Sequence, residues 1–580
     1  MNATDIVVDR AANAPDHVAF ERKIDGVWRP VATREFADEI IALAGGLIAA
    51  GVEPGDRIAI MSGTSYEWVL CDFAIQMVGA VTVPIYETSS PPQIEWFLTD
   101  SGANRIFVAD AATRAVVERA GVPAPCAVWT MDDGDIARLS ANGREVGPEP
   151  VHQRRQATTA DTLATIVYTS GTTGRPKGCM ISHGNLLAEI NSLLSAEGVR
   201  ELMLTADSSL LLFLPLAHIL ARIVQFAAFL GGARIAHTSD IRNVTTLLAE
   251  FKPTLLIAVP RVFEKVYNTA ARTAASTGRG RIFQAAEATA LAYSHAVDTG
   301  GPSLPLKLRH RLFDRLVYQR LRAATGGRVA YAVSGGAPLG PQLCHFMRGI
   351  GINVLEGWGL TETTAAVTFN LPAAQQVGSV GRPLPGREVR IADNGEVLVR
   401  GDTVFQGYWH NELDTADAID ADGWFHTGDL GEVNDGFLTI TGRAKDLLIT
   451  ASGKNVAPLF LENALRGHWL VDQCVLVGDR RPYVAALISL DGAAFADWKE
   501  EHRRPAEATV ADLRDDTELL GTIQNAVDEA NHLVSKAEGI KRFRLLPGQF
   551  EIGDELTPTQ EVRRRYVLAK FQADVEALYT

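Results

Sequence analysis

Cysteine is scarce in this 580-residue chain, and its cysteines occur without any CxxC spacing. This argues against a disulfide framework or a zinc site and predicts thiols in a reducing compartment. A long apolar run is also missing, because the most apolar stretch, residues 210–232, is broken by Pro215, His218, Arg222 and Gln225. We therefore expect buried core there and no membrane span. The cysteines are Cys71, Cys126, Cys179, Cys344 and Cys474.

Basic residues are in the minority. Lysine and arginine number 55 against 69 aspartates and glutamates, which gives a net charge of −14. This balance argues against a general nucleic-acid binder. Residues 1–20 carry charges where a signal peptide needs an apolar core. The composition predicts a soluble cytoplasmic protein, and at roughly 100–200 residues per domain the length predicts several folding units.

Short β-branched runs alternate with amphipathic helical patterns through the first two-thirds of the chain. Residues 57–61, 104–109 and 254–260 are examples of such runs. Strands that alternate with helices are typical of an α/β fold with a mostly parallel sheet. We therefore expect a large N-terminal α/β region.

The rest of the sequence has a different pattern. Short strands and turns begin near residue 386, and Asn394-Gly395 and Asp435-Gly436 are typical of hairpin turns. After Gly442, helical and strand patterns form a final α+β portion. We expect a domain boundary near residues 441–446.

Residues 168–178 read YTSGTTGRPKG and combine glycines, hydroxyl residues and a lysine. Glycines let backbone N–H groups approach a phosphate, hydroxyls donate hydrogen bonds, and the lysine adds positive charge. The stretch does not match the GxxxxGK[ST] pattern, because Lys177 lies between Pro176 and Gly178. It predicts a phosphate-binding loop of another kind.

Two later motifs suit the base and the metal of a nucleotide. Residues 334–339, SGGAPL, follow an apolar run, and small residues at the carboxyl end of a strand suit a flat ring. Residues 356–363, EGWGLTET, offer the aromatic face of Trp358 and the carboxylate of Glu362. These groups are the kinds that adenine and Mg²⁺ use.

Two further motifs complete the set. Residues 426–431, HTGDLG, contain Asp429, a carboxylate able to accept bonds from two ribose hydroxyls. Residues 442–455, GRAKDLLITASGKN, supply the cations Arg443, Lys445 and Lys454. In this order, the five motifs resemble those of the AMP-forming acyl-CoA synthetases.

The resemblance covers essentially the whole chain. Residues 83–103 and a helical insert at 304–327 are similar to the long-chain fatty acyl-CoA synthetase branch. The parts that it implies are an N-terminal adenylation domain (1–441, with a β-rich subdomain at about 386–441), a hinge (442–446) and a mobile α+β C-terminal domain (447–580).

The resemblance implies two half-reactions that use ATP, Mg²⁺ and coenzyme A. A fatty carboxylate attacks the α-phosphorus of ATP and gives acyl-AMP and pyrophosphate. The C-terminal domain then rotates, and the thiol of coenzyme A attacks the acyl-adenylate. Two alternatives stay open: a fatty acyl-AMP ligase that passes its acyl group to a carrier protein, and a catalytically weakened acyl- or nucleotide-binding protein.

The resemblance also assigns expected roles to matching residues. Asp429 and Arg443 would hold the ribose, Thr361 and Glu362 would lie by the α-phosphate and Mg²⁺, and Lys445 would lie at the hinge. Glu362 is thus the expected metal ligand. The other expected nucleotide-binding residues are Thr169, Ser170, Gly171, Thr172, Thr173, Gly174 and Lys177 for the β- and γ-phosphates, and Gly335, Gly336, Ala337, Glu356, Gly357, Trp358 and Gly359 around the adenine.

Some of these features also have purely structural interpretations. His218 fits a core histidine as well as a residue near the acyl site. Trp358, without the resemblance, would be a core aromatic. Residues 304–324 form a basic amphipathic helix, which is more often a solvated face but can lie on an anionic membrane. The sequence thus also allows peripheral membrane association.

One position departs from the resemblance. Where the family has a lysine in a segment resembling LTPTxKxxR, this chain has Glu561 within ELTPTQEVRRRYV. A carboxylate there would repel the substrate carboxylate and the phosphates, by roughly 4 kcal/mol at about 4 Å and an effective dielectric near 20. We therefore expect impaired adenylation with thioester formation largely retained.

Three explanations of Glu561 are open. The residue can be engineered to trap a complex. It can be natural, with Arg563 serving instead, since residues i and i+2 of an extended segment share a face. Or the natural protein is poor at the first half-reaction.

Overall fold

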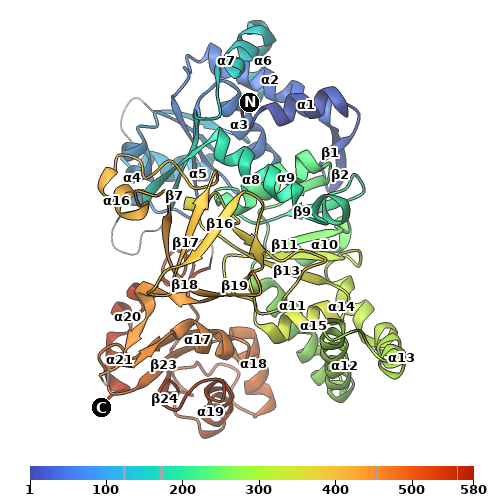
Figure 1. Cartoon of the computed structure of the whole chain (residues 1–580), viewed down its shortest axis with the longest axis vertical. Coiled ribbons are helices and arrows are strands. Elements are labelled where there is room, and N and C mark those ends of the chain that lie inside the picture. The colour runs from blue at the N-terminus through green and yellow to red at the C-terminus, as the bar shows by residue number, and fades with distance from the viewer. Residues whose placement is uncertain (122–125, 170–174, 452–453, 558–559) are drawn as a thin grey trace.

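The computed structural model describes residues 1–121, 126–169, 175–451, 454–557 and 560–580. Figure 1 shows a large N-terminal part that lies above and beside a smaller C-terminal part, which is drawn in orange to red. Parallel strands alternate with helices through the larger part. The fold is therefore of the α/β class, as the sequence predicted.

A six-stranded sheet contains both described ends of the predicted phosphate motif. Its order is β6-β5-β3-β4-β7-β8, and all its pairs are parallel except the β7–β8 hairpin. The expected runs at 57–61 and 104–109 are confirmed as β3 and β5. The strands are β3 (Arg57–Met61), β4 (Val81–Ile85), β5 (Arg105–Val108), β6 (Ala127–Thr130), β7 (Leu163–Thr169) and β8 (Lys177–Ser182).

A nine-stranded sheet has the order β15-β14-β13-β12-β11-β9-β10-β1-β2 and is parallel from β13 to β1. Its centre contains β11, within the expected run at 254–260. The strands are β1 (Val18–Ile24), β2 (Val27–Ala32), β9 (Ser209–Leu212), β10 (Arg234–His237), β11 (Leu255–Ala258), β12 (Tyr331–Ser334), β13 (Asn353–Trp358), β14 (Thr368–Phe369) and β15 (Arg382–Pro383).

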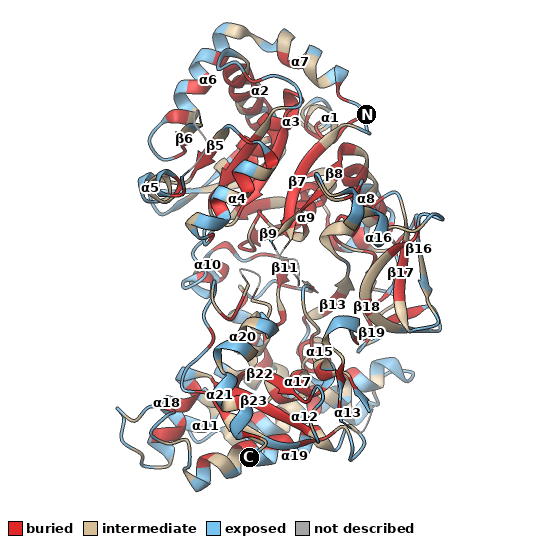
Figure 2. Cartoon of the chain, turned by 90° about the vertical axis from the view of Figure 1, so that its left-hand side faces the viewer, coloured by how far each residue is buried: buried red, intermediate tan, exposed pale blue. Residues whose placement is uncertain are grey.

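Helices pack against both sheets and against one another, with α2 against α3, α6 and α7, and α12 against α11, α13 and α15. Figure 2 shows buried strands inside and exposed helical faces outside. The helices are α1 (Asp5–Asn13), α2 (Thr33–Ala49), α3 (Tyr66–Met77), α4 (Pro91–Ser101), α5 (Ala111–Arg119), α6 (Asp135–Val146), α7 (Pro148–Ala157), α8 (His183–Ser195), α9 (Ile219–Gly231), α10 (Val244–Phe251), α11 (Pro260–Ser276), α12 (Gly280–Asp298), α13 (Leu304–Phe313), α14 (Gln319–Ala323) and α15 (Pro341–Gly349).

The apolar stretch at 210–232 forms β9 and α9 and is largely buried, as predicted. Arg222 is buried within it because its charge is satisfied internally: it donates to Asp72 on α3 and to the Thr165 hydroxyl on β7. Hydrogen bonding and charge pairing are what make such burial tolerable. Within the described ranges, no helix combines the length and apolarity needed to cross a bilayer.

A four-stranded antiparallel sheet follows, in the order β16-β17-β18-β19. Both predicted hairpin turns are confirmed, and Asp435 and Gly436 have φ angles of 51° and 81°, as an Asp-Gly turn allows. The elements are β16 (Arg387–Ile391), β17 (Glu396–Gly401), β18 (Phe425–Asn434), β19 (Phe437–Arg443) and a short helix, α16 (Glu412–Ala418).

The C-terminal part is a three-stranded sheet, β22-β23-β24, with helices around it. Its own buried cluster begins at Leu448 and includes Trp498 and Ile523. The elements are β20 (Leu448–Ile449), β21 (Asn455–Val456), α17 (Pro458–Arg466), β22 (Val471–Val477), β23 (Val484–Leu490), α18 (Gly492–Glu501), α19 (Thr517–Asn531), β24 (Ile540–Leu545), α20 (Arg564–Lys570) and α21 (Gln572–Ala577).

Charged side chains join the two parts. Arg261 on α11 forms ion pairs with Asp472 and Asp491, and Arg272 on the same helix lies 3.4 Å from Asp497. Asp472 is buried in its pair with Arg261, whereas the more exposed Arg272–Asp497 pair contributes little, about 0–1 kcal/mol. Ion pairs of both kinds therefore connect α11 to the C-terminal part.

Candidate active site

The described ends of the predicted phosphate motif lie on two paired strands. Thr169, the last residue of β7, pairs with Lys177, the first residue of β8. The Lys177 ammonium lies 2.5 Å from a carboxylate oxygen of Asp414 on α16. Five residues of the expected phosphate clamp lie outside the described residues: Ser170, Gly171, Thr172, Thr173 and Gly174.

The expected metal ligand, Glu362, lies next to this hairpin in a 3₁₀ turn that also contains Thr361. The Tyr408 hydroxyl donates to the Glu362 carboxylate at 2.9 Å. The ring of Tyr408 also lies 4.9 Å from the Lys177 ammonium. The structure thus brings both Lys177 and Glu362 to one tyrosine.

Glu362 fits Mg²⁺ in its donor chemistry, since the ion takes oxygen ligands and usually binds one or two carboxylates together with water and phosphate oxygens. In the part of the chain that the structure describes, no group of three or more His, Cys, Asp or Glu side chains is arranged to hold a metal ion. A nucleotide-borne Mg²⁺ needs no such group.

Asp429 is the centre of a second cluster. The Trp358 indole N–H donates to one of its carboxylate oxygens at 2.8 Å, and the Arg443 guanidinium donates to the other at 2.9 Å. Asp429 and Arg443 are paired residues of β18 and β19, so the sheet register sets this contact. Asp429 is buried, whereas Arg443 is exposed. Three predicted residues from three motifs therefore meet at one carboxylate.

The expected adenine motifs lie side by side. Ser334, which ends β12, is the register partner of Glu356 on β13, and Gly335, Gly336 and Ala337 follow directly. Glu356 is buried and accepts the Leu339 N–H at 2.9 Å. Burial raises the pKa of Glu356 to about 7, although this hydrogen bond opposes the rise.

The turn after β13 leaves no room for a side chain at Gly359. A Cβ there would lie 1.6 Å from the Ala365 carbonyl oxygen. Gly357 is also close-packed, with the Phe369 ring 2.9 Å from where its Cβ would be. Trp358 between them packs on the apolar cluster that contains Val367. Trp358 is therefore half-buried, with its ring against this cluster and its indole N–H on Asp429.

His218 caps α9, since its Nδ1 accepts the Leu220 N–H at 3.2 Å. Burial lowers the pKa of His218 to about 4, so the ring is neutral near pH 7. Its structural interpretation is therefore supported by an observed contact. Its expected place near an acyl group stays a prediction.

Glu561 lies within electrostatic range of the Asp429 cluster. Burial raises the pKa of Glu561, Arg443 acts in the opposite direction, and Asp429 adds to the rise. Tyr86 is also close enough for Glu561 to raise its pKa, after the larger effect of burial. The carboxylate at the position of the family lysine thus lies near Asp429 and Arg443.

Arg563 is directed elsewhere. Its guanidinium donates to the carbonyl oxygens of Gly553 and Asp554 at 2.9 and 2.8 Å and lies over the Tyr566 ring. The segment turns back on itself, with a bridge between Leu556 and Val562, so the simple alternation of an extended strand does not apply. In this arrangement, Arg563 stabilises the turn at 553–554.

Lys445, at the expected hinge, is exposed and lies in a short turn between β19 and β20. Its charge contributes, as the last of several causes, to lowering the pKa of Asp414. Lys445 is therefore near the carboxylate that pairs with Lys177. Tyr408 and Asp414 were missed by sequence reasoning, because only the fold brings them to Lys177.

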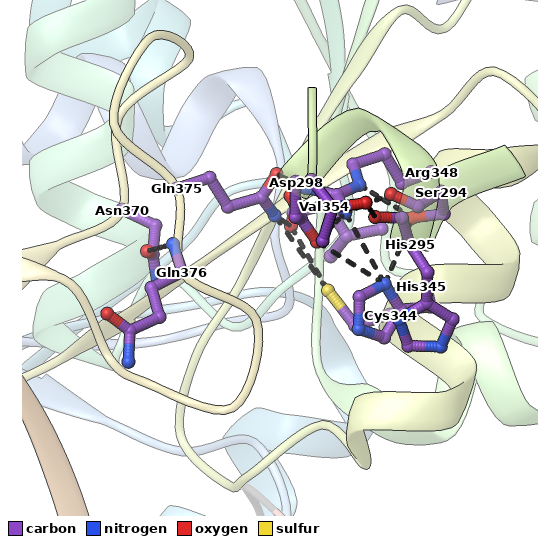
Figure 3. Close-up of polar contacts among 11 residues, drawn as sticks. Ser294, His295, Asp298, Cys344, His345, Arg348, Val354, Asn370, Gln375 and Gln376 are labelled. Atoms are coloured by element: carbon purple, nitrogen blue, oxygen red, sulfur yellow. Dashed lines mark hydrogen bonds and ion pairs between the residues drawn. The ribbon is translucent and has the colours of Figure 1, made fainter. Parts of the chain in front are cut away.

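A separate polar cluster lies between α12 and α15 (Figure 3). His295 packs on His345 with ring centroids 3.8 Å apart, and Arg348 lies 2.5 Å from Asp298. Arg348 also reaches Gln375, which donates to a carbonyl of β13 at 2.6 Å. Arg348 already neutralises Asp298 within this cluster, and the cluster joins α12 and α15 to β13. We therefore assign it a structural role, apart from the candidate site.

With this geometry in place, comparisons with known proteins identify the class. The AMP-binding enzyme family matches residues 7–409, and the AMP-binding enzyme C-terminal domain matches residues 445–580. The chain belongs to the AMP-binding enzyme family.

Two relatives with similar sequences are named as long-chain-fatty-acid–CoA ligases. The chain is 49% identical to "Long-chain-fatty-acid--CoA ligase FadD15" of Mycobacterium tuberculosis, with 100% of this chain and 97% of the relative covered. It is 28% identical to "Long-chain-fatty-acid--CoA ligase 6" of Homo sapiens, with 96% and 84% covered.

Solved structures show the same fold at low identity. The anthranilate CoA ligase AuaEII in complex with anthranoyl-AMP has a TM-score of 0.76 at 19% identity, with 99% of this chain and 98% of that chain covered. ATP-bound MatB from Rhodopseudomonas palustris has a TM-score of 0.72 at 22% identity, with 99% of each chain covered.

Proposed function

We propose that the chain is an AMP-forming long-chain fatty acid–CoA ligase. It would activate a fatty acid with ATP as acyl-AMP and pass the acyl group to coenzyme A. The observation that carries this proposal is the meeting of Trp358, Asp429 and Arg443, which belong to three motifs far apart in sequence. The full-length similarity to long-chain ligases supports the choice of substrate.

We propose that this chain holds ATP at two ends. Lys177 and the hairpin loop bind the β- and γ-phosphates, and Asp429 accepts the ribose hydroxyls. A carboxylate oxygen has two lone pairs, so Asp429 can accept ribose hydroxyls while it keeps its bonds to Trp358 and Arg443. The glycines after β12 leave space for the adenine.

Glu362 would hold Mg²⁺, which when bound neutralises phosphate charge and favours attack at the α-phosphorus. Tyr408 orients this carboxylate through its hydroxyl. Neutral His218 adds no charge near the fatty carboxylate, which keeps an acyl pocket apolar. The substrates required are therefore a fatty acid, ATP and coenzyme A, with Mg²⁺.

We propose that residues 442–446 act as the hinge between an N-terminal domain, residues 1–441, and a mobile C-terminal domain, residues 447–580. The short turn at Ala444–Asp446 lies between the two buried cores. The ion pairs of α11 with Asp491 and Asp497 are partly exposed, and exchanging them for water costs little, whereas Asp472 is buried in its pair with Arg261. Rotation about this turn would remove Glu561 from Asp429 and admit coenzyme A.

The assay for this function uses palmitate, ATP, Mg²⁺ and coenzyme A, and it follows palmitoyl-CoA, AMP and pyrophosphate together. A second arm starts from synthetic palmitoyl-AMP, so that slow adenylation does not hide the thioester step. Palmitoyl-CoA from either arm supports the proposal. Accumulation of acyl-AMP without a coenzyme A thioester points to a carrier-protein acceptor, and binding with no turnover in either arm points to a weakened binding protein.

Glu561 makes adenylation depend on pH in a defined direction. Its pKa is raised by burial, against the effect of Arg443 and with that of Asp429, so it gains a proton at a higher pH than an ordinary glutamate. As the pH falls towards this raised pKa, the negative charge disappears and the repulsion with it. We therefore expect the rate of pyrophosphate release by the original chain, divided by the rate for Glu561→Gln, to rise towards one as the pH falls. A ratio that stays constant with pH would contradict this.

We also propose a peripheral membrane contact through residues 304–324, which contain six basic residues and one acidic residue in a chain of net charge −14. A stripe of leucines along this segment is exposed, and α13 projects from the side of the molecule in Figure 1. Basic groups beside exposed leucines suit an anionic lipid surface. The leucines, with exposed fractions of 75%, 65%, 56% and 50%, are Leu304, Leu308, Leu312 and Leu316.

Vesicles test this contact. We expect binding to phosphatidylglycerol vesicles at low salt, and roughly tenfold weaker partitioning for the double variant Leu308→Ser, Leu312→Ser, because about 1.4 kcal/mol of apolar burial is lost. Leu533→Ser, at an exposed leucine of the C-terminal domain, is the matched control. Equal partitioning of all three proteins would argue against the contact.

A further inference from the structure

The ammonium of Lys177 is paired with a carboxylate of its own chain. Its Nζ lies 2.5 Å from Oδ2 of Asp414, and the two side chains are 30% and 36% exposed. The pair is therefore open to a ligand from solvent. It lies at the start of β8, opposite the last residue of β7.

Asp414 is fixed before any ligand arrives. The Asn411 side-chain amide donates to its Oδ2 at 2.7 Å, and the Asp414 backbone N–H donates to the Asn411 side-chain oxygen at 3.1 Å. Asn411 thereby caps α16 and holds the carboxylate at its first turn. The position of this carboxylate is thus built into the helix start.

The chain before α16 is joined to the phosphate hairpin. The Trp409 N–H donates to the Gly178 carbonyl at 2.7 Å, and the Met180 N–H donates to the Gly407 carbonyl at 3.0 Å. Tyr408 therefore forms an isolated antiparallel bridge with Cys179 on β8. Because this bridge connects the chain before α16 to the strand that begins at Lys177, the backbone helps to set the contact between Lys177 and Asp414.

The charges around Asp414 resemble those around a bound phosphate oxygen. The hydrogen bond from Lys177 is the main cause that lowers the pKa of Asp414, burial opposes it, and Asn411 and the charges of Lys177 and Lys445 lower it further. A phosphate would likewise offer an anionic oxygen to Lys177 and to a neighbouring amide N–H. A nucleotide phosphate that reaches Lys177 must compete with this carboxylate.

We propose that Asp414 is the resting counter-ion of the nucleotide site. It holds Lys177 in place while the site is empty, and it yields the lysine to the phosphates of ATP. Asp414 is thus a positioning residue that weakens nucleotide binding and eases release of pyrophosphate. The inference rests on the proposed function, because it takes Lys177 to bind the phosphates of ATP.

Calorimetric titration of ATP into the full-length protein at low salt tests this inference. Asp414→Asn removes the charge but keeps the size, and we expect ATP to bind about three- to fivefold more tightly, the range that a partly exposed ion pair supplies. The gain should shrink as salt is raised, because partly exposed charges are screened. Asp417→Asn, at an exposed carboxylate on the same helix, is the matched control and should bind ATP as the original chain does.

The variant Lys177→Met completes a double-mutant cycle. If Asp414 acts through Lys177, Asp414→Asn should tighten ATP binding less when Lys177 is already absent. Unchanged or weaker binding in Asp414→Asn, or an equal gain in both backgrounds, would overturn the inference while leaving the ligase function intact. Failure of the original chain to bind ATP at all would overturn both.

Discussion

Replacing Glu561 by lysine is expected to accelerate the formation of acyl-AMP by about thirtyfold or more. At about 4 Å and an effective dielectric near 20, one pair of unit charges is worth roughly 4 kcal/mol. Relief of half of that repulsion, about 2 kcal/mol, already corresponds to roughly thirtyfold in rate. Lysine would add attraction to the substrate carboxylate and the phosphates, so the gain exceeds that of removing the charge. Pyrophosphate release with fatty acid and ATP measures it.

Two comparisons make this result specific to the charge. Glu561→Gln should recover part of the gain, since it removes repulsion without adding attraction. Thioester formation from synthetic acyl-AMP should change little in either variant, because we expect this segment to leave the site before coenzyme A reacts. Equal rates of pyrophosphate release for the original chain and Glu561→Lys would refute the handicap.

The parts of the candidate site that could be predicted from the sequence are those that depend on short local patterns of residues. A small-residue turn after an apolar strand places Gly335 and Gly336 at the carboxyl end of β12, where parallel sheets bind ligands. The neighbouring motif lies beside it because β12 and β13 are parallel partners, with Ser334 opposite Glu356. Sequence pattern and sheet topology were therefore sufficient to predict that these two motifs lie side by side.

The parts that sequence reasoning missed depend on distant pairing. Asp414 is separated from Lys177 by most of the N-terminal domain, and nothing in the residues around it signals a charge partner. For Arg563, in contrast, the sequence predicted a neighbour that the fold does not provide. Alternation along an extended segment would place it beside Glu561, but the segment turns and its guanidinium binds the carbonyls of the turn. A turn changes which side chains share a face, and the local sequence did not reveal this one.

Replacing Asp429 by asparagine is expected to weaken ATP binding by about a hundredfold. Hydrogen bonds to a charged group contribute about 1.5–3 kcal/mol each, and an amide can accept through only one of its two terminal atoms. Losing one such bond to the ribose, together with the charge that orients Arg443, amounts to roughly 3 kcal/mol, about a hundredfold. Arg443 is exposed, so water can solvate its guanidinium and the fold should survive.

A matched control on the same hairpin is needed to show that the loss of ATP affinity comes from the site and not from a destabilised domain. Asp435→Asn changes the exposed turn between β18 and β19, where the φ angle of 51° suits asparagine, and it should bind ATP normally. Thermal unfolding of both variants checks the fold, and calorimetry measures the affinity. Should Asp429→Asn bind ATP within about threefold of the original chain, Asp429 does not hold the ribose. The ribose would then have to be assigned to other residues, and only the assignment of the phosphates to Lys177 would remain.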